Sequence, residues 1–383
     1  MIKSGNMTRL FMVIFVLGTL SPAQTFTTLY NFAGDANGGY PVSSLVQDEA
    51  GNLYGTAPEG GLAGDGVVFK VDSAGKQTVL HIFAGGPSDG AIPIGPLLRD
   101  GHGNLYGTTS AGGTNKIGVV YKIDSAGKET ILHNFGHKPS DACAPNQGLI
   151  MDKQGNLYGA TLFCGASSDG AVFKLTPTGR ETVLHSFSGS PDGAFPQFGR
   201  LLMDQKGNLY GTTEQGGTHG GGTVYKLTPD GKLIVLHSFA GGAGDGCAPY
   251  GTPAMDNAGN LYGTTNYCGA SGEGIVWKVS PKGAETVLHN FTGGVSDGAY
   301  PFAGVTLDSN RNIYGVTGDG GANGLGVVYE LDKKGKLSVL HTFDGSNGEI
   351  PFAEILRDAD GTIFGAAEFG GSSGKYGTVW ELQ

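Results

Sequence analysis

Carboxylates recur at one position of this 383-residue chain, four residues before a proline that opens a short apolar segment. The position holds Asp89, Asp141, Asp192, Asp245 and Asp297, with Asn37 and Asn347 in the two remaining copies. Carboxylate oxygens are the ligands that calcium and magnesium prefer, so five of them facing one axis would bind such an ion. Glycine follows the position in six of the seven copies, which is typical of a tight turn and favours a structural role instead.

Histidine recurs in the same way. Six of the nine histidines occupy one position near the end of another apolar segment, namely His81, His133, His185, His237, His289 and His341, and Tyr30 takes the place in the first copy. One metal ion holds its ligands at about 2 Å, which residues spread over separate repeats cannot satisfy together. Tyrosine in the remaining copy suits packing or hydrogen bonding. We therefore expect these histidines to be structural.

A reaction centre requires residues that break the repeat. Glu214 and His219 lie in one glycine-rich loop, and glutamate and histidine are the residue types that transfer protons or assist a metal in catalysis. No pair in the chain has a spacing that demands a nucleophile beside a base. Glu214 and His219 are thus the candidates for catalysis, and solvated loop residues are the alternative interpretation.

Aromatic residues follow the recurring proline in three consecutive copies, as Tyr250, Phe302 and Phe352, with Tyr300 nearby. Such a group of rings could stack on a sugar or hold a peptide. The same rings could equally fill a tapering channel. They are the candidate ligand-binding residues.

The four cysteines form two pairs in identical phase, Cys143 with Cys164 and Cys247 with Cys268. The members of each pair are 21 residues apart, and the pairs are two repeat lengths apart. One zinc ion could not reach all four thiolates across that separation. We predict two disulfides, each of which closes a loop of about 20 residues and contributes roughly 3 kcal/mol in the entropic description.

A repeat of about 52 residues organises all of these positions. The tripeptide LYG begins at Leu53, Leu105, Leu157, Leu209 and Leu261, and it recurs as IYG at Ile313 and IFG at Ile363. The glycine-rich surroundings could pass for a phosphate-binding loop, but such a loop has no reason to occur seven times. Periodicity of this size indicates stacked supersecondary units.

Each repeat contains four short apolar runs, which we call A to D. In the second repeat they are Pro93–Leu98, Leu105–Thr109, Val119–Ile123 and Thr130–Phe135. All are rich in β-branched and aromatic residues, and the turns that join A to B and C to D carry glycine at a fixed offset. Four antiparallel strands per repeat predict an all-β, seven-bladed β-propeller. The recurring aspartates would then enter the innermost strand, near the mouth of the central channel.

The two ends of the chain predict how the ring closes. The segment Thr27–Phe32 is a run D, whereas Gly377–Leu382 is a run C. The count of runs is complete only if the first of these strands joins the last blade. We expect this pairing to staple the ring and to leave no open sheet edge.

The first residues have the features of an export signal. Lys3 and Arg9 precede the apolar run 10–20, and Ser21-Pro22-Ala23 offers small residues for cleavage. We expect residues 1–23 to be removed and residues 24–383 to form a single propeller, in the periplasm, at the cell surface or outside the cell.

Without Lys3 and Arg9 the formal charge changes from −10 to −12. An acidic chain with no basic cluster and no second long apolar run predicts neither nucleic-acid binding nor a membrane span, and we expect a monomer.

The sequence resembles a known repeat family. LYGTT followed by Gly-Gly, then Gly-Val-Val-Tyr-Lys and Val-Leu-His-Asn-Phe, is similar to the GloVer tandem repeat of exported bacterial proteins, and the likeness covers essentially the whole chain after residue 23. The resemblance implies an exported repeat protein and brings no established activity or catalytic residues. The pattern is also similar to kelch propellers and, more loosely, to the seven-bladed lyase and NHL propellers.

These observations favour a non-enzymatic binding scaffold. The B–C and D–A loops would form a face that holds a peptide, protein or glycan, and no cofactor is required. The alternative is a metal-assisted lyase or hydrolase at the channel mouth, with calcium or magnesium as the ion. A purely structural component of the cell envelope is a third interpretation.

Overall fold

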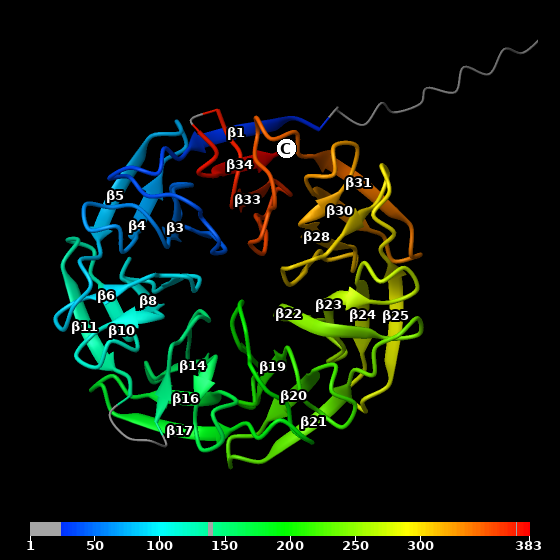
Figure 1. Cartoon of the computed structure of the whole chain (residues 1–383), viewed down its shortest axis with the longest axis horizontal. Coiled ribbons are helices and arrows are strands. Elements are labelled where there is room, and N and C mark those ends of the chain that lie inside the picture. The colour runs from blue at the N-terminus through cyan, green and yellow to red at the C-terminus, as the bar shows by residue number, and fades with distance from the viewer. Residues whose placement is uncertain (1–23, 137–140, 373) are drawn as a thin grey trace, which may run out of the picture.

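The protein is a ring of seven four-stranded antiparallel sheets, as the repeat predicts (Figure 1). The computed structural model describes residues 24–136, 141–372 and 374–383, and every regular element in these ranges is a β-strand. The predicted export signal, residues 1–23, lies outside the described residues. The prediction of a seven-bladed β-propeller is confirmed.

The strands of each blade run from A at the centre to D at the rim. The first blade consists of β2 (Val46–Gln47), β3 (Leu53–Ala57), β4 (Val67–Val71) and β5 (Gln77–Ile82). The second consists of β7 (Leu98–Arg99), β8 (Leu105–Thr109), β10 (Val119–Ile123) and β11 (Glu129–Asn134). The third consists of β13 (Ile150–Met151), β14 (Leu157–Thr161), β16 (Ala171–Leu175) and β17 (Glu181–Ser186). The fourth and fifth consist of β18 (Leu202–Met203), β19 (Leu209–Thr213), β20 (Thr223–Leu227) and β21 (Leu233–Ser238); and β22 (Gly246–Met255), β23 (Leu261–Cys268), β24 (Ile275–Val279) and β25 (Glu285–Asn290). The sixth consists of β27 (Thr306–Leu307), β28 (Ile313–Thr317), β30 (Val327–Leu331) and β31 (Leu337–Thr342).

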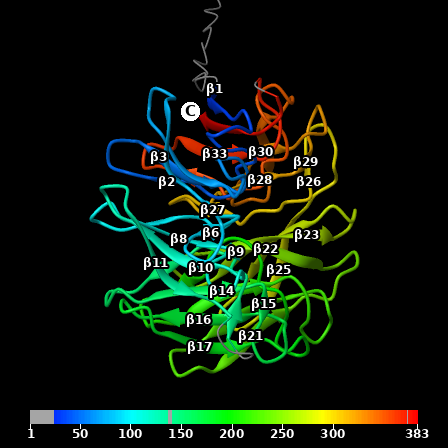
Figure 2. The same ribbon diagram turned by 60° about the vertical axis from the view of Figure 1, so that its left-hand side comes forward.

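The seventh blade joins the two ends of the described chain. Its strands are β32 (Leu356–Arg357), β33 (Ile363–Ala367), β34 (Thr378–Leu382) and β1 (Phe26–Asn31), and β1 is its outermost strand. In the ladder Phe26 lies opposite Leu382 and Asn31 lies opposite Thr378. Both views place β1 beside β34 (Figure 1 and Figure 2). The predicted closure is confirmed.

Strand A is shorter than predicted in six blades. In the second blade the ladder includes only Leu98 and Arg99, although the sequence predicted a strand from Pro93. Some residues before strand A hydrogen-bond across to neighbouring blades. For example, the Thr108 hydroxyl donates to the Gln147 carbonyl oxygen of the third blade at 2.8 Å. The inner segments therefore tie the blades together around the axis.

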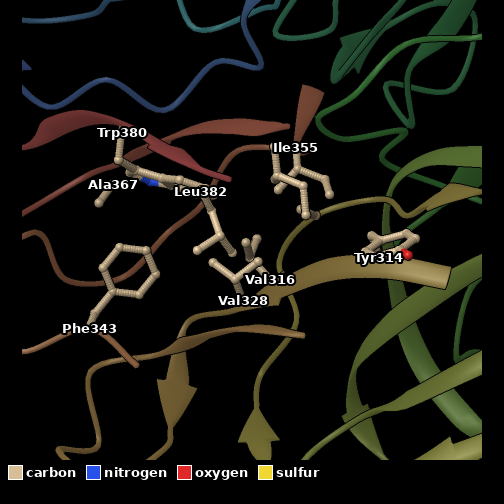
Figure 3. Packing of buried hydrophobic residues seen from close by; sticks show 10 residues of the cluster. Tyr314, Val316, Val328, Phe343, Ile355, Ala367, Trp380 and Leu382 are labelled. Carbon is tan, nitrogen blue, oxygen red and sulfur yellow. The ribbon is translucent and has the colours of Figure 1, made fainter. Parts of the chain in front are cut away.

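The hydrophobic core is divided into seven clusters, one between each pair of neighbouring blades. Strand C is buried on both sides, since each blade packs against two others. Between the sixth and seventh blades, Val328 and Phe343 pack with Trp380 and Leu382 (Figure 3). The glycine of LYG leaves room for this packing, because a Cβ on Gly107 would collide with the Tyr121 ring of the adjacent strand.

The two predicted disulfides are present. Cys143 and Cys164 are joined across the small sheet of β12 (Ala142–Cys143) and β15 (Phe163–Cys164), and their Cα atoms are 5.5 Å apart. Cys247 and Cys268 are joined across the extended β22 and β23, with Cα atoms 5.4 Å apart. The same small sheet forms without cysteines from β6 (Gly90–Ala91) with β9 (Ala111–Gly112) and from β26 (Gly298–Ala299) with β29 (Asp319–Gly320). The bridges therefore reinforce a geometry that the repeat adopts without them.

Within the described ranges no helix is long and apolar enough to span a membrane.

Candidate ligand-binding site

The B–C and D–A connections emerge at one end of the ring, which we call the loop face. A strained residue anchors every D–A connection. The residue before each recurring proline has φ between +50° and +58°, and these residues are Tyr40, Ile92, Ala144, Phe195, Ala248, Tyr300 and Ile350. Left-handed backbone is unfavourable for side chains of this size, above all for isoleucine, so the surrounding structure must hold it.

Backbone hydrogen bonds hold these residues from both sides. The N–H of Ile92 donates to the Asp65 carbonyl of the first blade at 2.9 Å, and its carbonyl accepts from the N–H of Ser110 in the second blade at 3.1 Å. The same pair of bonds surrounds Tyr300 and Ile350. The side chains that follow each proline are thereby fixed relative to two blades at once.

Four aromatic rings meet at the axial end of the loop face, and we call them the aromatic ring set: Phe198, Tyr250, Phe302 and Phe352. Phe198 stacks on Tyr250 at 5.6 Å and Phe302 stacks on Phe352 at 5.0 Å, between ring centroids. Two edge-on contacts complete a closed circuit of four rings: Phe198 with Phe352 at 4.9 Å and Tyr250 with Phe302 at 6.2 Å between ring centroids. All four side chains are partly exposed. The structure thus brings together three of the four predicted ligand-binding residues and adds Phe198.

Tyr300, the fourth predicted ligand-binding residue, lies apart from the aromatic ring set. Its ring packs edge-on against Tyr267 at 5.7 Å. Two further pairs of this kind occur at other blade junctions, Phe163 with Phe195 and Tyr40 with Phe369. The loop face therefore carries aromatic rings both at its axis and farther out.

A hollow of about 490 Å³ adjoins the aromatic ring set. The residues after the recurring proline in the first two blades, Val42 and Ile94, and in the seventh blade, Phe352, all line it. Its lining residues include Val42, Ile92, Ile94, Phe198, Phe352, Glu59, Asp65 and Glu368. The hollow thus combines apolar walls with carboxylates.

The carboxylates of the hollow come from both ends of the chain. Glu59 follows β3 in the first blade, and Glu368 follows β33 in the seventh. Burial, reinforced by the negative charge of Glu59, raises the pKa of Glu368 to about 7. A carboxyl group with that pKa exchanges its proton near neutral pH, which is the property of a general acid or base.

The two predicted catalytic residues are held at different places. Glu214 accepts hydrogen bonds from the Gln197 amide and from Tyr250, so it lies under the aromatic ring set. Burial raises the pKa of Glu214, although hydrogen bonds with Gln215 and Tyr250 oppose the shift. His219 is exposed, and its Nδ1 lies 3.1 Å from the carbonyl oxygen of Ser238 at the end of the outer strand β21. The hydrogen bonds therefore hold Glu214 near the axis and His219 near the rim.

The five predicted metal-binding aspartates lie at the rim and not at the channel mouth. In four of them an oxygen lies near the Nε2 atom of the histidine on the preceding outer strand: 3.2 Å for Asp89, 2.8 Å for Asp192, 3.3 Å for Asp245 and 3.0 Å for Asp297. Asp141 belongs to the corresponding cluster with His133. A single ion shared by all five is ruled out, since each aspartate serves its own blade junction.

Sequence reasoning did not identify Phe198, Glu59 or Glu368. A signal for Phe198 was present, because the segment between Pro196 and the Asp204 turn is one residue longer than in the other repeats. Glu59 and Glu368 gave no such signal, since the predicted ring closure makes the first and last repeats neighbours but does not show which of their side chains meet.

The fold and the loop face define a seven-bladed propeller with an axial, aromatic-lined hollow. The profile of the Gloeobacter/Verrucomicrobia repeat matches residues 13–161, 138–309 and 200–383. The chain therefore belongs to the Gloeobacter/Verrucomicrobia repeat family. No curated protein matches it.

Several solved structures share the fold. A streptogramin B lyase has a TM-score of 0.63 and 16% identity, over 95% of this chain and 99% of that chain. The virginiamycin B lyase from Staphylococcus aureus has a TM-score of 0.59 and 14% identity, over 94% of this chain and 98% of that one. The extracellular domain of a hybrid two-component system from B. thetaiotaomicron has a TM-score of 0.57 and 15% identity, over 93% of this chain and 41% of that one. At these identities the likeness shows the fold alone.

Proposed function

We propose that this protein is an exported binding scaffold whose loop face holds a neutral glycan at the aromatic ring set and the adjoining hollow. The observation that carries the proposal is the circuit of four partly exposed rings beside a hollow of about 490 Å³. The two disulfides support an exported location, because such bridges persist in oxidising compartments.

The chemistry of the hollow favours a sugar. Flat aromatic rings stack on the apolar faces of a pyranose, and carboxylates accept hydrogen bonds from its hydroxyl groups. Glu59, Asp65 and Glu368 would repel an anionic ligand. A basic peptide could also meet these carboxylates, but fixed rings in a small concave site suit a rigid ring better than a flexible chain.

The proposal is tested by measuring binding of neutral oligosaccharides on a glycan array, followed by calorimetry with the retained glycans. Tyr250→Ala and Phe352→Ala should each raise the dissociation constant about tenfold or more, because they remove stacking surface from the centre of the site. Val295→Ala is the matched control, since Val295 is an exposed apolar residue of a D–A loop outside the hollow.

Three results would count against glycan binding. No retained glycan, or equal affinity in all three variants, contradicts the proposal. Retention of a basic peptide library in place of glycans, lost in Tyr250→Ala, would assign the same face to a peptide.

A hydrolase at the hollow is the second candidate, and Glu368 is the observation that favours it. A carboxyl group with a pKa near 7 beside a second carboxylate resembles the acid and base of a glycoside hydrolase. The array experiment distinguishes the two functions, because the retained glycans can be recovered and analysed for cleavage. Cleavage by the native chain that is lost in Glu368→Gln, with binding retained, would make the protein an enzyme.

A further inference from the structure

Among the residues that the structure describes, a histidine and two carboxylates meet at three of the seven blade junctions, on the rim and away from the loop-face hollow. The three clusters, which we call the rim triads, are His81 with Asp89 and Glu129, His133 with Asp141 and Glu181, and His237 with Asp245 and Glu285. Within each triad one ligand atom from each residue lies within 4.8 Å of the others. The histidines and aspartates recur visibly in the sequence, whereas the glutamate position holds other residues in four of the seven repeats.

Each triad draws on two blades. The histidine comes from the outer strand of one blade, as in β11 for His133, and the glutamate is the first residue of the next outer strand, as in β17 for Glu181. The aspartate comes from the connection between the two blades. A ligand held by all three residues would therefore clamp neighbouring blades together.

The glutamates have buried oxygen atoms that no hydrogen bond satisfies. These atoms are Oε1 of Glu129, Glu181 and Glu285. The Glu181 side chain is only 9% exposed, and its other oxygen, Oε2, lies 3.1 Å from His133 Nε2. A buried carboxylate oxygen without a partner is costly, so each of these atoms calls for a proton or a cation.

Burial raises the pKa of the glutamate in all three triads, and in the second triad Glu181 is also hydrogen-bonded to His133, which opposes the shift. Burial raises the pKa of Glu129, and the charge of Asp89 adds to this effect while His81 opposes it. Burial and the charge of Asp245 act in the same way on Glu285. Each triad with a neutral imidazole carries two negative charges in a partly dry site, which is the charge that one divalent cation would balance.

We propose that each rim triad is a binding site for one divalent first-row transition ion of the zinc or manganese class. An imidazole nitrogen with two carboxylate oxygens is a mixed nitrogen and oxygen set, which suits these ions better than the all-oxygen sites of calcium and magnesium. Three protein ligands leave room for water at the remaining positions. This inference is independent of the glycan site.

The repeat supplies natural comparison junctions in the same chain. At two junctions the histidine and aspartate are present, but leucine replaces the glutamate, as Leu233 opposite His185 and Leu337 opposite His289. At the sixth-to-seventh junction Phe26 stacks on His341 with ring centroids 3.6 Å apart. Between the seventh and first blades, Tyr30, Asn37 and Gln77 occupy the positions of the histidine, aspartate and glutamate. We expect no ion at these four junctions, so the native chain should bind three.

The test is metal titration of the tag-free full chain after removal of metals with a chelator. Zn²⁺ and Mn²⁺ are each titrated by calorimetry, and bound metal is counted by elemental analysis after dialysis. The expected result is three ions per chain. Glu181→Gln should bind two, and the Glu129→Gln, Glu181→Gln, Glu285→Gln triple variant should bind none.

A gain-of-site variant keeps the test meaningful if the loss variants fold poorly. Leu233→Glu completes a fourth triad with His185 and Asp192, so its stoichiometry should rise to four. Asp192→Asn is the matched control, because it alters a junction without a glutamate and should leave three ions bound. Circular dichroism checks that every variant is folded.

Specific outcomes would overturn the assignment. A folded native chain that binds neither Zn²⁺ nor Mn²⁺ would mean that protons balance the triads instead. Binding of Ca²⁺ in preference to Zn²⁺ and Mn²⁺ would contradict the ion class. A stoichiometry that Glu181→Gln and Leu233→Glu leave unchanged would locate the ions elsewhere.

Discussion

At the scale of single residues, burial and the hydrogen bonds that a carboxylate accepts act against each other on its pKa. Asp89 and Glu129 belong to the same rim triad, yet their pKa values shift in opposite directions. Burial acts upward on both, but His81 and backbone N–H groups bind Asp89 and hold its pKa below the usual range. The hydrogen bonds that a carboxylate accepts thus determine whether it stays charged.

Glu368 should make the protein less stable as pH rises. Its pKa is about 7 in the folded chain, above the ordinary value of 4.5 that it regains on unfolding, so the folded state holds the proton more tightly. The free energy of unfolding contributed by this proton is fully present below pH 4.5 and is lost as pH rises to about 7. Glutamine carries no ionisable group, so Glu368→Gln does not lose stability as pH rises. We expect the variant to be more stable than the native chain at pH 8 by about 1 kcal/mol, allowing for partial solvent screening.

Urea unfolding at pH 4, 6 and 8 measures this effect. The difference in the free energy of unfolding between Glu368→Gln and the native chain should grow in favour of the variant as pH rises. Glu59→Gln should show a smaller version of the same trend, because it removes one of the two causes of the shift. A constant difference at the three pH values would refute the raised pKa.

At the scale of the elements, the A–B hairpins repeat one set of hydrogen bonds. In the first blade Asp48 Oδ1 accepts from the backbone N–H of Ala50 and Asn52, and Oδ2 accepts from Tyr54. The turn needs left-handed backbone at its fourth residue, which is glycine in blades one to five, such as Gly51 with φ of +82°. The sixth blade has Arg311 there, with φ of +68°.

Arg311→Gly should stabilise the protein by about 0.5–1 kcal/mol, because glycine adopts this conformation without steric cost. The midpoint of urea unfolding measures the gain. Gly51→Arg is the matched reverse substitution at a turn where a Cβ would meet open space, and it should lose a similar amount. A destabilised Arg311→Gly chain would show that contacts of the arginine side chain outweigh the backbone term.

At the scale of the whole molecule, β1 stabilises the closed ring by pairing with β34 and burying aromatic side chains. Phe32 is 1% exposed in the cluster between the last and first blades, and Phe26 packs against Trp380. Burial of one such ring contributes about 2 kcal/mol. Without β1, strand β34 would also present an unpaired edge.

Removal of residues 24–32 should therefore lower the free energy of unfolding by several kcal/mol and promote association through β34. Urea unfolding and size-exclusion chromatography measure the two effects. A chain that begins at residue 24 is the control and should behave as the intact ring. Equal unfolding midpoints for the two chains would contradict a stabilising role for β1.

The local order of the repeat was readable from the sequence, because each unit contains its own turns and its own alternation of apolar residues. LYG and the strand C pattern predicted β8 and β10 to the residue, and the cysteine phase predicted both disulfides. Strand A was less predictable, since its backbone groups bond to neighbouring blades. Contacts between repeats are not encoded in the pattern of any one repeat.

The candidate sites depend on contacts between different repeats. Phe198 and Phe352 meet across the axis only because the ring closes, and the same closure brings Glu59 to the hollow that Glu368 lines. The rim triads likewise combine a histidine of one blade with a glutamate of the next. The sequence by itself determined the strands, the turns, the disulfides and the number of blades, because those depend on neighbouring residues and on a regular period. Only the tertiary structure decided which acids and rings share a site, since burial and charge depend on residues that are distant along the chain.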